Sequence, residues 1–171
     1  MKSTTGNLRR AFSFAELLIV ISILAIVSAL VVPLAGDEDA TGVRAAAELL
    51  AADIEDIQAR SLAEPGQTSS LIPHADSSGW YIARTSEPGQ PINGVDGRPL
   101  IRRFGSDALA GSAAVVFTVP SLSSSGLAFD DQGAPLALSE AITFRLATPD
   151  DSLELGVRVS AATGRVSITR E

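Results

Sequence analysis

Cysteine is absent from this 171-residue chain, and histidine, tryptophan and tyrosine occur once each. The chain therefore has no disulfide, no thiolate metal site and no cysteine nucleophile. Acidic residues number 20 against 13 basic ones, which gives a net charge of -7. A surface of that sign repels phosphate backbones and argues against nucleic acid as a partner. The length fits one ordinary hydrophobic core with an appendage.

Charge is almost absent from Phe12 to Ala35, where Glu16 is the only charged residue. About 20 apolar residues, rising ~1.5 Å each, cross a hydrocarbon core of ~30 Å, so the run predicts a transmembrane helix over residues 12–35. Two arginines precede it and three acidic residues follow it. By the positive-inside rule we expect the N-terminus of this single-pass chain to stay in the cytoplasm and the rest of the chain to be exported.

Two simpler interpretations of this run stay open: an ordinary secretory signal peptide cut near Ala35, and a plain single-helix anchor. Glu16 argues against both, because a carboxylate inside an apolar helix costs about 2.5 to 3.5 kcal/mol at the bilayer centre and less near the interface. A plain anchor gains nothing from that cost. The alternative for Glu16 is a side chain that reaches back to the lipid headgroups.

The residues around Glu16, Ala11-Phe12-Ser13-Phe14-Ala15-Glu16-Leu17-Leu18-Ile19-Val20, resemble the cleavage and methylation motif of type IV prepilins and type II secretion pseudopilins. The resemblance implies that a prepilin peptidase cuts between Ala11 and Phe12 and that Phe12 is N-methylated. It also implies that Glu16 meets the Phe12 amine of a neighbouring subunit during assembly. The family has glycine where this chain has Ala11. Pro33 stands where the family commonly breaks the helix, and its missing N–H fits such a break.

Beyond the apolar run, a second pattern predicts an amphipathic helix that ends at Pro65-Gly66. Apolar or small residues recur there at spacings of three and four. The stripe consists of Val43, Ala47, Leu50, Ile54, Ile57 and Ser61. We therefore expect one long helix over residues 12–63, transmembrane in its first half and amphipathic in its second.

After Pro65 the chain turns to short runs rich in β-forming residues, separated by Gly, Pro, Ser and Asp. The expected strands are Gly79–Arg84, Leu100–Phe104, Ala114–Val119, Leu127–Phe129, Ala141–Ala147, Leu153–Val159 and Arg165–Thr169. Thr163-Gly164 should turn the last two into a hairpin. The segment 85–98, rich in proline and glycine, is expected to be an exposed loop.

These patterns predict an α+β fold in which the long N-terminal helix packs on a small antiparallel β-sheet head. The expected divisions are a leader (1–11), the transmembrane and polymerisation helix (12–35), its amphipathic continuation (36–64) and the head (65–171). Four segments resemble the head of GspH/FimT-like pseudopilins: Gln58-Ala59-Arg60-Ser61, Trp80-Tyr81, Phe129-Asp130-Asp131-Gln132-Gly133 and Gly164-Arg165-Val166. That resemblance implies two small antiparallel sheets and no catalytic activity.

No catalytic, metal-binding or cofactor motif stands out. His74 lies beside Pro73 without a serine motif around it, which favours a surface histidine. The pairs Asp130-Asp131 and Asp150-Asp151 could suggest calcium, but neither is embedded in a ligand loop, so turn residues are favoured. The arginines that could contact DNA are diluted by nearby carboxylates; they are Arg102, Arg103, Arg158, Arg165 and Arg170.

We therefore expect a non-enzymatic minor pseudopilin, a structural subunit of a type II secretion-like filament. The resemblance implies that it is a single-pass protein of the bacterial inner (cytoplasmic) membrane, with a cytoplasmic N-terminus and a periplasmic head. Its expected partners are other pseudopilins or pilins, the prepilin peptidase, the inner-membrane assembly platform and membrane lipid, and no cofactor is expected. One alternative is a minor pilin of a type IV pilus that serves adhesion or DNA uptake. The second alternative is an exported soluble binding domain with an ordinary signal peptide.

Overall fold

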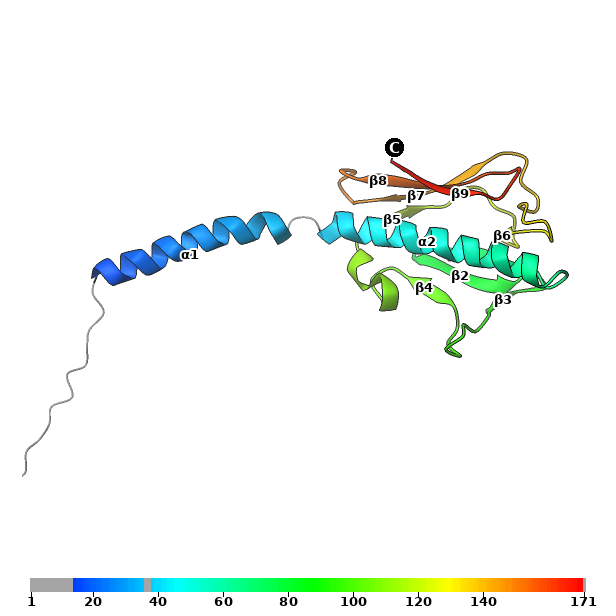
Figure 1. The fold of residues 1–171 in the computed structure, drawn as a ribbon, viewed down its shortest axis with the longest axis horizontal. Coiled ribbons are helices and arrows are strands. Elements are labelled where there is room, and N and C mark those ends of the chain that lie inside the picture. The colour runs from blue at the N-terminus through cyan, green and yellow to red at the C-terminus, as the bar shows by residue number, and fades with distance from the viewer. Residues whose placement is uncertain (1–13, 36–37, 171) are drawn as a thin grey trace, which may run out of the picture. The chain divides into compact units, whose positions relative to one another are not determined.

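The structure is a computed structural model that describes the backbone of residues 14–35 and 38–170, and the side chains of these residues apart from 29–35. Its helices are α1 (Phe14–Ala35) and α2 (Glu38–Ala63), followed by nine strands and a short 3-10 helix, η1 (Asp107–Ser112). Figure 1 shows the two helices as separate ribbons. The chain divides into two compact units, Met1–Asp37 and Glu38–Glu171.

The predicted transmembrane helix over residues 12–35 is wrong. Among the residues that the structure describes, no helix is long and apolar enough to cross a membrane. The predicted single-pass inner-membrane location is therefore wrong as well, because it depended on a helix of that kind among the described residues.

The predicted fold class needs the same correction. Two helices, α1 and α2, stand in place of one long helix over residues 12–63. The α+β composition is retained, because α2 is followed by strands that form two antiparallel sheets. The head therefore includes α2, and its compact unit begins at Glu38.

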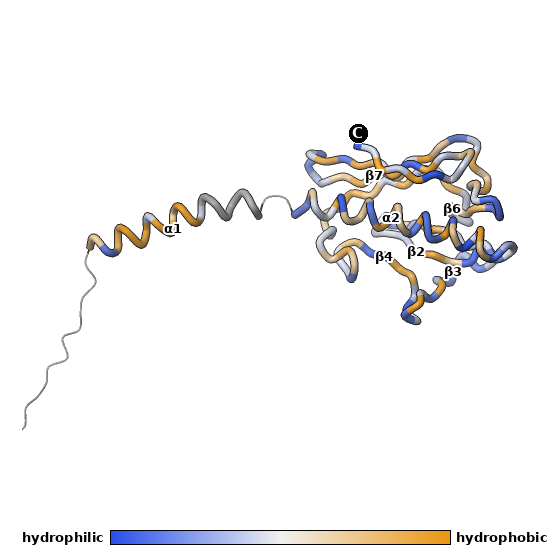
Figure 2. The backbone as a smooth tube through the Cα atoms, in the orientation of Figure 1, coloured by the Kyte–Doolittle hydropathy of each residue, from blue (hydrophilic) through white to orange (hydrophobic). Residues whose placement is uncertain are grey.

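α2 supplies the central apolar face of the head. Glu38 and Asp39 lie in its first turn and Arg60 in its last, the arrangement that a helix dipole favours. The whole predicted stripe is buried, which confirms the period of this helix: Val43, Ala47, Leu50, Ile54, Ile57 and Ser61. In Figure 1 the helix runs along both sheets, and Figure 2 shows apolar and polar residues alternating along it.

The first sheet has five strands in the order β3-β2-β1-β6, with β4 also paired to β2. Its strands are β1 (Ser69–Pro73), β2 (Gly79–Arg84), β3 (Glu87–Pro91), β4 (Ile101–Arg103) and β6 (Leu127–Ala128). The second sheet has the order β5-β7-β8-β9. Its strands are β5 (Val116–Thr118), β7 (Ile142–Ala147), β8 (Glu154–Val159) and β9 (Val166–Arg170). The strands paired in each sheet are antiparallel.

Both sheets and α2 contribute to one hydrophobic core. Its largest fully buried side chains are Trp80 from β2, Phe144 from β7 and Phe129 from the segment after β6. Phe117 links the aromatic groups, because its ring centroid lies 5.9 Å from that of Trp80 and 6.1 Å from that of Phe144. The second sheet is thus joined to the first by aromatic packing as well as through α2.

Each of the seven predicted strands has an observed counterpart, and β2 spans the predicted residues Gly79–Arg84. Two strands were missed. β1 reads Ser-Ser-Leu-Ile-Pro, too short and polar for the alternation rule, and β3 reads Glu-Pro-Gly-Gln-Pro inside the predicted loop 85–98. β3 lies at the edge of its sheet, where a proline without an N–H is tolerated.

Candidate assembly and binding surfaces

α1 exposes apolar side chains on every side. Ten large hydrophobic residues of this helix are between 43% and 76% exposed, with Phe14 the most exposed and Val20 the least. Five of them are consecutive, Leu17–Ile21, and at about 100° per residue five positions go round the whole helix. The hydroxyl of Ser22 donates to the Leu18 carbonyl at 2.8 Å, which satisfies it within the helix. Figure 2 shows α1 as an almost unbroken apolar rod over its described part.

Glu16 lies in the first turn of α1 and is exposed. A carboxylate is favoured there because the first turn carries the positive end of the helix dipole. The other predicted assembly residues, Ala11 and Phe12, lie outside the described residues. α1 continues through Pro33 and ends at Ala35. The side chain of Pro33 is not among those that the structure describes. The cleavage, methylation and helix-break assignments therefore stay predictions.

A buried polar cluster formed by Asp53, Trp80 and Arg102 joins α2 to the first sheet. Asp53 is 7% exposed. Its Oδ2 accepts from Trp80 Nε1 at 2.8 Å and from Arg102 Nε at 3.1 Å, and its Oδ1 accepts from Arg102 Nη2 at 3.2 Å. Asp53 was not among the residues predicted from the sequence. Its position on the buried side of the helical stripe, between Leu50 and Ile54, is the signal that could have found it.

A second polar contact brings together three segments that carried the resemblance of the head. Gln58 Nε2 donates to the carbonyl of Gly133 at 2.6 Å and to that of Thr163 at 3.2 Å. A Cβ on Gly164 would meet the Gly133 carbonyl, Gln58 Nε2 and Phe129 Cε1. Three segments are therefore closely packed together: the end of α2, the turn after β6 and the β8–β9 turn. The polar groups that join them are backbone carbonyls and an amide, which hold structure and offer no reacting group.

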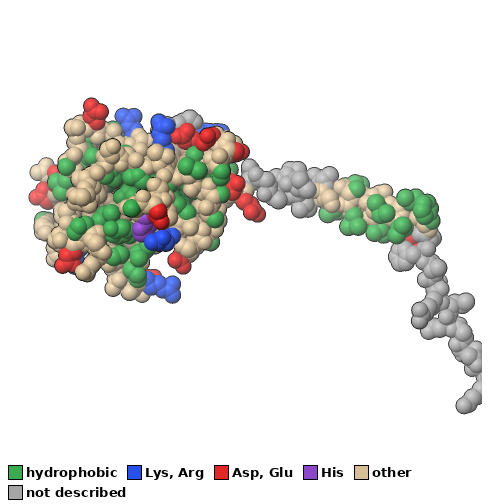
Figure 3. All heavy atoms as spheres, turned by 180° about the vertical axis from the view of Figure 1, so that it is seen from behind, with side chains coloured by type: hydrophobic (Ala, Val, Ile, Leu, Met, Phe, Trp, Pro, Cys, Tyr) green, Lys and Arg blue, Asp and Glu red, His purple; other side chains and the backbone are tan. Residues whose placement is uncertain are grey.

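His74 follows β1 and packs against Tyr81, with ring centroids 5.3 Å apart. Burial lowers the pKa of His74 below its usual value of 6.5, Arg103 lowers it further, and Asp76 opposes both. Figure 3 shows the histidine, in purple, beside an acidic and a basic side chain. Nε2 of His74 has no hydrogen-bond partner within the described part of the chain.

The aspartate pairs belong to turns. Asp130 Oδ1 accepts from the backbone N–H groups of Gln132 at 3.0 Å and Ala134 at 2.7 Å. Asp150 Oδ1 accepts from the Ser152 N–H at 3.2 Å. Hydrogen bonds from Thr148 and Ser152 lower the pKa of the Asp150 carboxyl. Among the described residues, no group of three or more His, Asp or Glu side chains is arranged to hold a metal ion.

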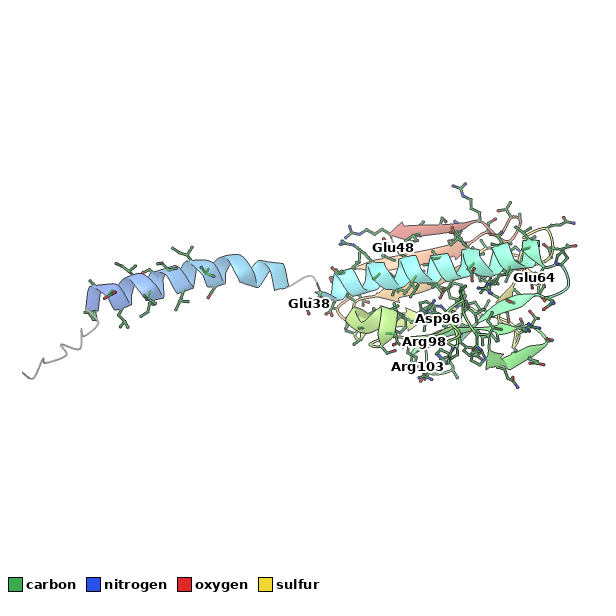
Figure 4. The ribbon with its side chains drawn as sticks, turned by 60° about the horizontal axis from the view of Figure 1, so that its bottom comes forward. Glu38, Glu48, Glu64, Asp96, Arg98 and Arg103 are labelled. Atoms are coloured by element: carbon green, nitrogen blue, oxygen red, sulfur yellow. The ribbon has the colours of Figure 1, made fainter. Side chains whose placement is uncertain are left out.

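The arginines considered for DNA occupy different sites. Arg102 is engaged with Asp53, and Arg103 lines a hollow of about 410 Å³ together with Arg98, Asp96 and Asp107. Figure 4 shows Asp96, Arg98 and Arg103 on the β4 side of the head. Arg158 and Arg165 line a separate hollow of about 540 Å³ whose other lining residues are Ala141, Ser160, Thr163 and Ser167. This second hollow has no acidic lining.

Comparison of the chain with family models, with curated proteins and with solved structures finds no match in any of the three. The fold and the contacts described above are therefore the basis for a functional conclusion. The two features that stand out are the apolar helix α1 and the head that begins at Glu38.

Proposed function

We propose that this chain is a non-enzymatic assembly subunit, which joins other subunits through α1 and presents the head formed by residues 38–171. The observation that carries the proposal is the exposed apolar surface of α1, where ten large hydrophobic side chains are at least 43% exposed. An exposed apolar surface of this extent marks an interaction site.

The occupant of that surface should cover it on all sides. A groove on a partner covers one face of a helix, whereas a bundle of like helices surrounds each member. Full burial of a large apolar side chain contributes about 1.5–3 kcal/mol. If roughly half of that remains to be gained at each of ten residues, the sum is about 10 kcal/mol. This is comparable with the ~4–15 kcal/mol that association costs, so contacts with several neighbouring helices are needed for a stable assembly.

Glu16 has a defined part in this proposal. Within a bundle its carboxylate would be buried, at a cost of several kcal/mol unless an opposite charge accompanies it. The motif at Ala11, Phe12 and Glu16 resembles one in which a prepilin peptidase frees the amine of Phe12 for a neighbouring subunit. That amine would supply the charge. The function proposed is thus that of a filament subunit of the kind this motif belongs to.

Two filament roles were expected from the sequence. The main one was a minor pseudopilin of a type II secretion-like filament, and the alternative was a minor pilin that displays its head on a type IV pilus for adhesion or DNA uptake. The display role is the better supported of the two, because the head carries an open strand edge at β9 and a hollow lined by Arg158 and Arg165. These features give a displayed head something to bind with, whereas a subunit that only pushes cargo has no need of them.

The test of the Glu16 assignment is a Glu16→Ala variant scored for incorporation into filaments in the native cell. We expect the protein to accumulate but to be recovered outside the assembled fraction. Glu55→Ala is the matched control, because Glu55 is an exposed glutamate of α2. Normal incorporation of Glu16→Ala would show that the carboxylate has no part in assembly.

A second candidate is a binding domain that is released from its N-terminal segment by an ordinary signal peptidase. It is favoured by the compact unit Glu38–Glu171 and by the finding that no described helix can cross a membrane. Mass analysis of the mature protein separates the two candidates. A chain that starts with methylated Phe12 supports the filament subunit, and one that starts at Asp37 supports the released domain.

A further inference from the structure

We propose that β9 and the basic hollow beside it bind an extended, acidic segment of another protein chain by strand addition. This inference goes beyond the assembly role of α1 and does not rest on it, because every residue that it uses lies in the head. Figure 1 shows β9 as the last strand of the chain, beside β8.

β9 is an open edge of the second sheet. The sheet ends at β9, which pairs with β8 alone within the described part of the chain. In an antiparallel ladder alternate residues direct their backbone groups to opposite sides, so an edge strand leaves every second N–H and C=O without a strand partner. β9 spans five residues, Val166–Arg170, without proline or glycine. It is therefore a template for another extended chain.

The other edges are short or protected. β3 contains Pro88 and Pro91 and begins with Glu87, and prolines and charges are devices that prevent edge pairing. β4 and β5 have three residues each and β6 has two. β9 has five residues and no proline, and its one charged residue is Arg170 at its end, which distinguishes it from the other edge strands that the structure describes.

The charge beside β9 defines the partner. Arg158 of β8 lies directly opposite Ser167 of β9, and both line the hollow of about 540 Å³ together with Arg165. Arg158 and Arg165 are exposed, and neither forms an ion pair among the described residues. In a chain with a net charge of -7, two such arginines and three hydroxyl side chains form a local site for carboxylates.

The two faces of β9 differ in polarity, so the partner segment should alternate between acidic and apolar residues. Ile168 is 41% exposed and lies opposite Val157, which is fully buried, so it belongs to the core side of the sheet. Ser167 lies on the opposite side, beside Arg158. Because successive side chains of a strand alternate between faces, the fitting partner has acidic residues at every second position and apolar residues between them. Nucleic acid fits less well, since it cannot pair with the strand backbone and is repelled by the acidic chain.

The test uses the full-length chain in detergent and a fluorescent eight-residue peptide, Glu-Val-Glu-Val-Glu-Val-Glu-Val. We expect saturable binding by anisotropy, weakening as salt is raised, and loss of binding when the glutamates of the peptide are replaced by glutamine. The double variant Arg158→Gln, Arg165→Gln should weaken binding about five-fold, the scale of two exposed ion pairs. Arg98→Gln is the matched control, because Arg98 is an exposed arginine of another hollow, and it should bind as the unmodified chain does.

Ile168→Pro tests the strand pairing, because proline removes an N–H from the edge. We expect it to abolish binding while the circular dichroism spectrum is retained. The arginine variants keep the test decisive if that variant does not fold. Equal weakening by Arg98→Gln, equal binding of the glutamine peptide, or binding of a short DNA duplex in place of the peptide would each overturn the proposal.

Discussion

At the scale of single residues, the contact between Asp53, Trp80 and Arg102 places an ion pair at the boundary between α2 and the first sheet. The side chain of Asp53 is 9% exposed and that of Arg102 is 25% exposed, so water screens the pair only in part. A buried pair of this kind is weak evidence of net stabilisation, but removing one partner leaves the other charge uncompensated. The loss of stability on removing one partner can be measured by mutation.

We expect Asp53→Ala to destabilise the head by about 3 kcal/mol, since it strands the Arg102 guanidinium and the Trp80 N–H. Chemical denaturation followed by tryptophan fluorescence gives the free energy of unfolding. Asp56→Ala is the matched control, because Asp56 pairs with Arg60 at the exposed surface of the same helix. That variant should lose about 0.5 kcal/mol or less. Equal losses in the two variants would show that the buried cluster has no special weight.

His74 should make stability depend on pH in a defined window. Burial and Arg103 lower its pKa in the folded chain below 6.5, so the folded state binds this proton less readily than the unfolded state. The stability that neutral His74 contributes is present above pH 6.5 and is lost as the pH falls through the lowered pKa. We expect the difference in unfolding free energy between the unmodified chain and His74→Gln to change between pH 7 and 5.

The aspartates with lowered pKa act in a different range. Hydrogen bonds from Ser78 lower the pKa of Asp76 below 3.8, and those from Thr148 and Ser152 do the same for Asp150. Their stabilisation is present above pH 3.8 and is lost below it, outside the window of His74. If the difference in unfolding free energy between the unmodified chain and His74→Gln does not change from pH 7 to 5, His74 is not the source of the pH dependence.

At the scale of elements, the β8–β9 hairpin is held against α2 by a close approach at Gly164. This residue has φ +66°, and a Cβ there would meet backbone, amide and aromatic atoms. Gly97 has a similar φ of +76° in open space. We expect Gly164→Ala to lower the unfolding free energy by about 3 kcal/mol and Gly97→Ala by about 1 kcal/mol, because only the first adds a steric clash to the strained backbone. Thermal unfolding measures both changes. Similar losses of unfolding free energy in the two variants would mean that the contacts around Gly164 can rearrange to accommodate a Cβ.

The elements also show what the sequence could predict. The buried stripe of α2 and the strand β2 follow from periodicity, because α2 buries one face and β2 is rich in aromatic and aliphatic residues. β1 and β3 were missed because their pairing with β2 stabilises residues whose local preferences are poor for strands. The ion pair of Asp53 with Arg102 joins residues 49 positions apart, and no local pattern encodes such a partner.

The apolar run shows the opposite kind of error. Its composition suggested one membrane-spanning helix over residues 12–35, continuous with the amphipathic stripe, whereas the structure has two helices and none that can cross a membrane among the residues described. Hydropathy reports that a segment avoids water. It does not report whether lipid or other protein helices provide the apolar surroundings, so the partner of α1 could not be read from composition.

At the scale of the whole molecule, the head should fold without α1. The unit Glu38–Glu171 contains α2, both sheets and the core residues. We expect a chain that begins at Glu38 to unfold cooperatively, with the same thermal midpoint as the full-length chain. A lower midpoint or a loss of cooperativity would show that the head depends on the N-terminal unit.

Whether the exposed side chains of α1 are covered by other copies can be measured by disulfide crosslinking. The chain has no cysteine, so a single Leu18→Cys substitution introduces the only thiol. Val95→Cys is the matched control, because Val95 is fully exposed in the head. We predict that mild oxidation of the assembled protein gives covalent dimers with Leu18→Cys and none with Val95→Cys. Leu18→Cys that stays monomeric, or dimers formed equally by both variants, would contradict assembly through α1.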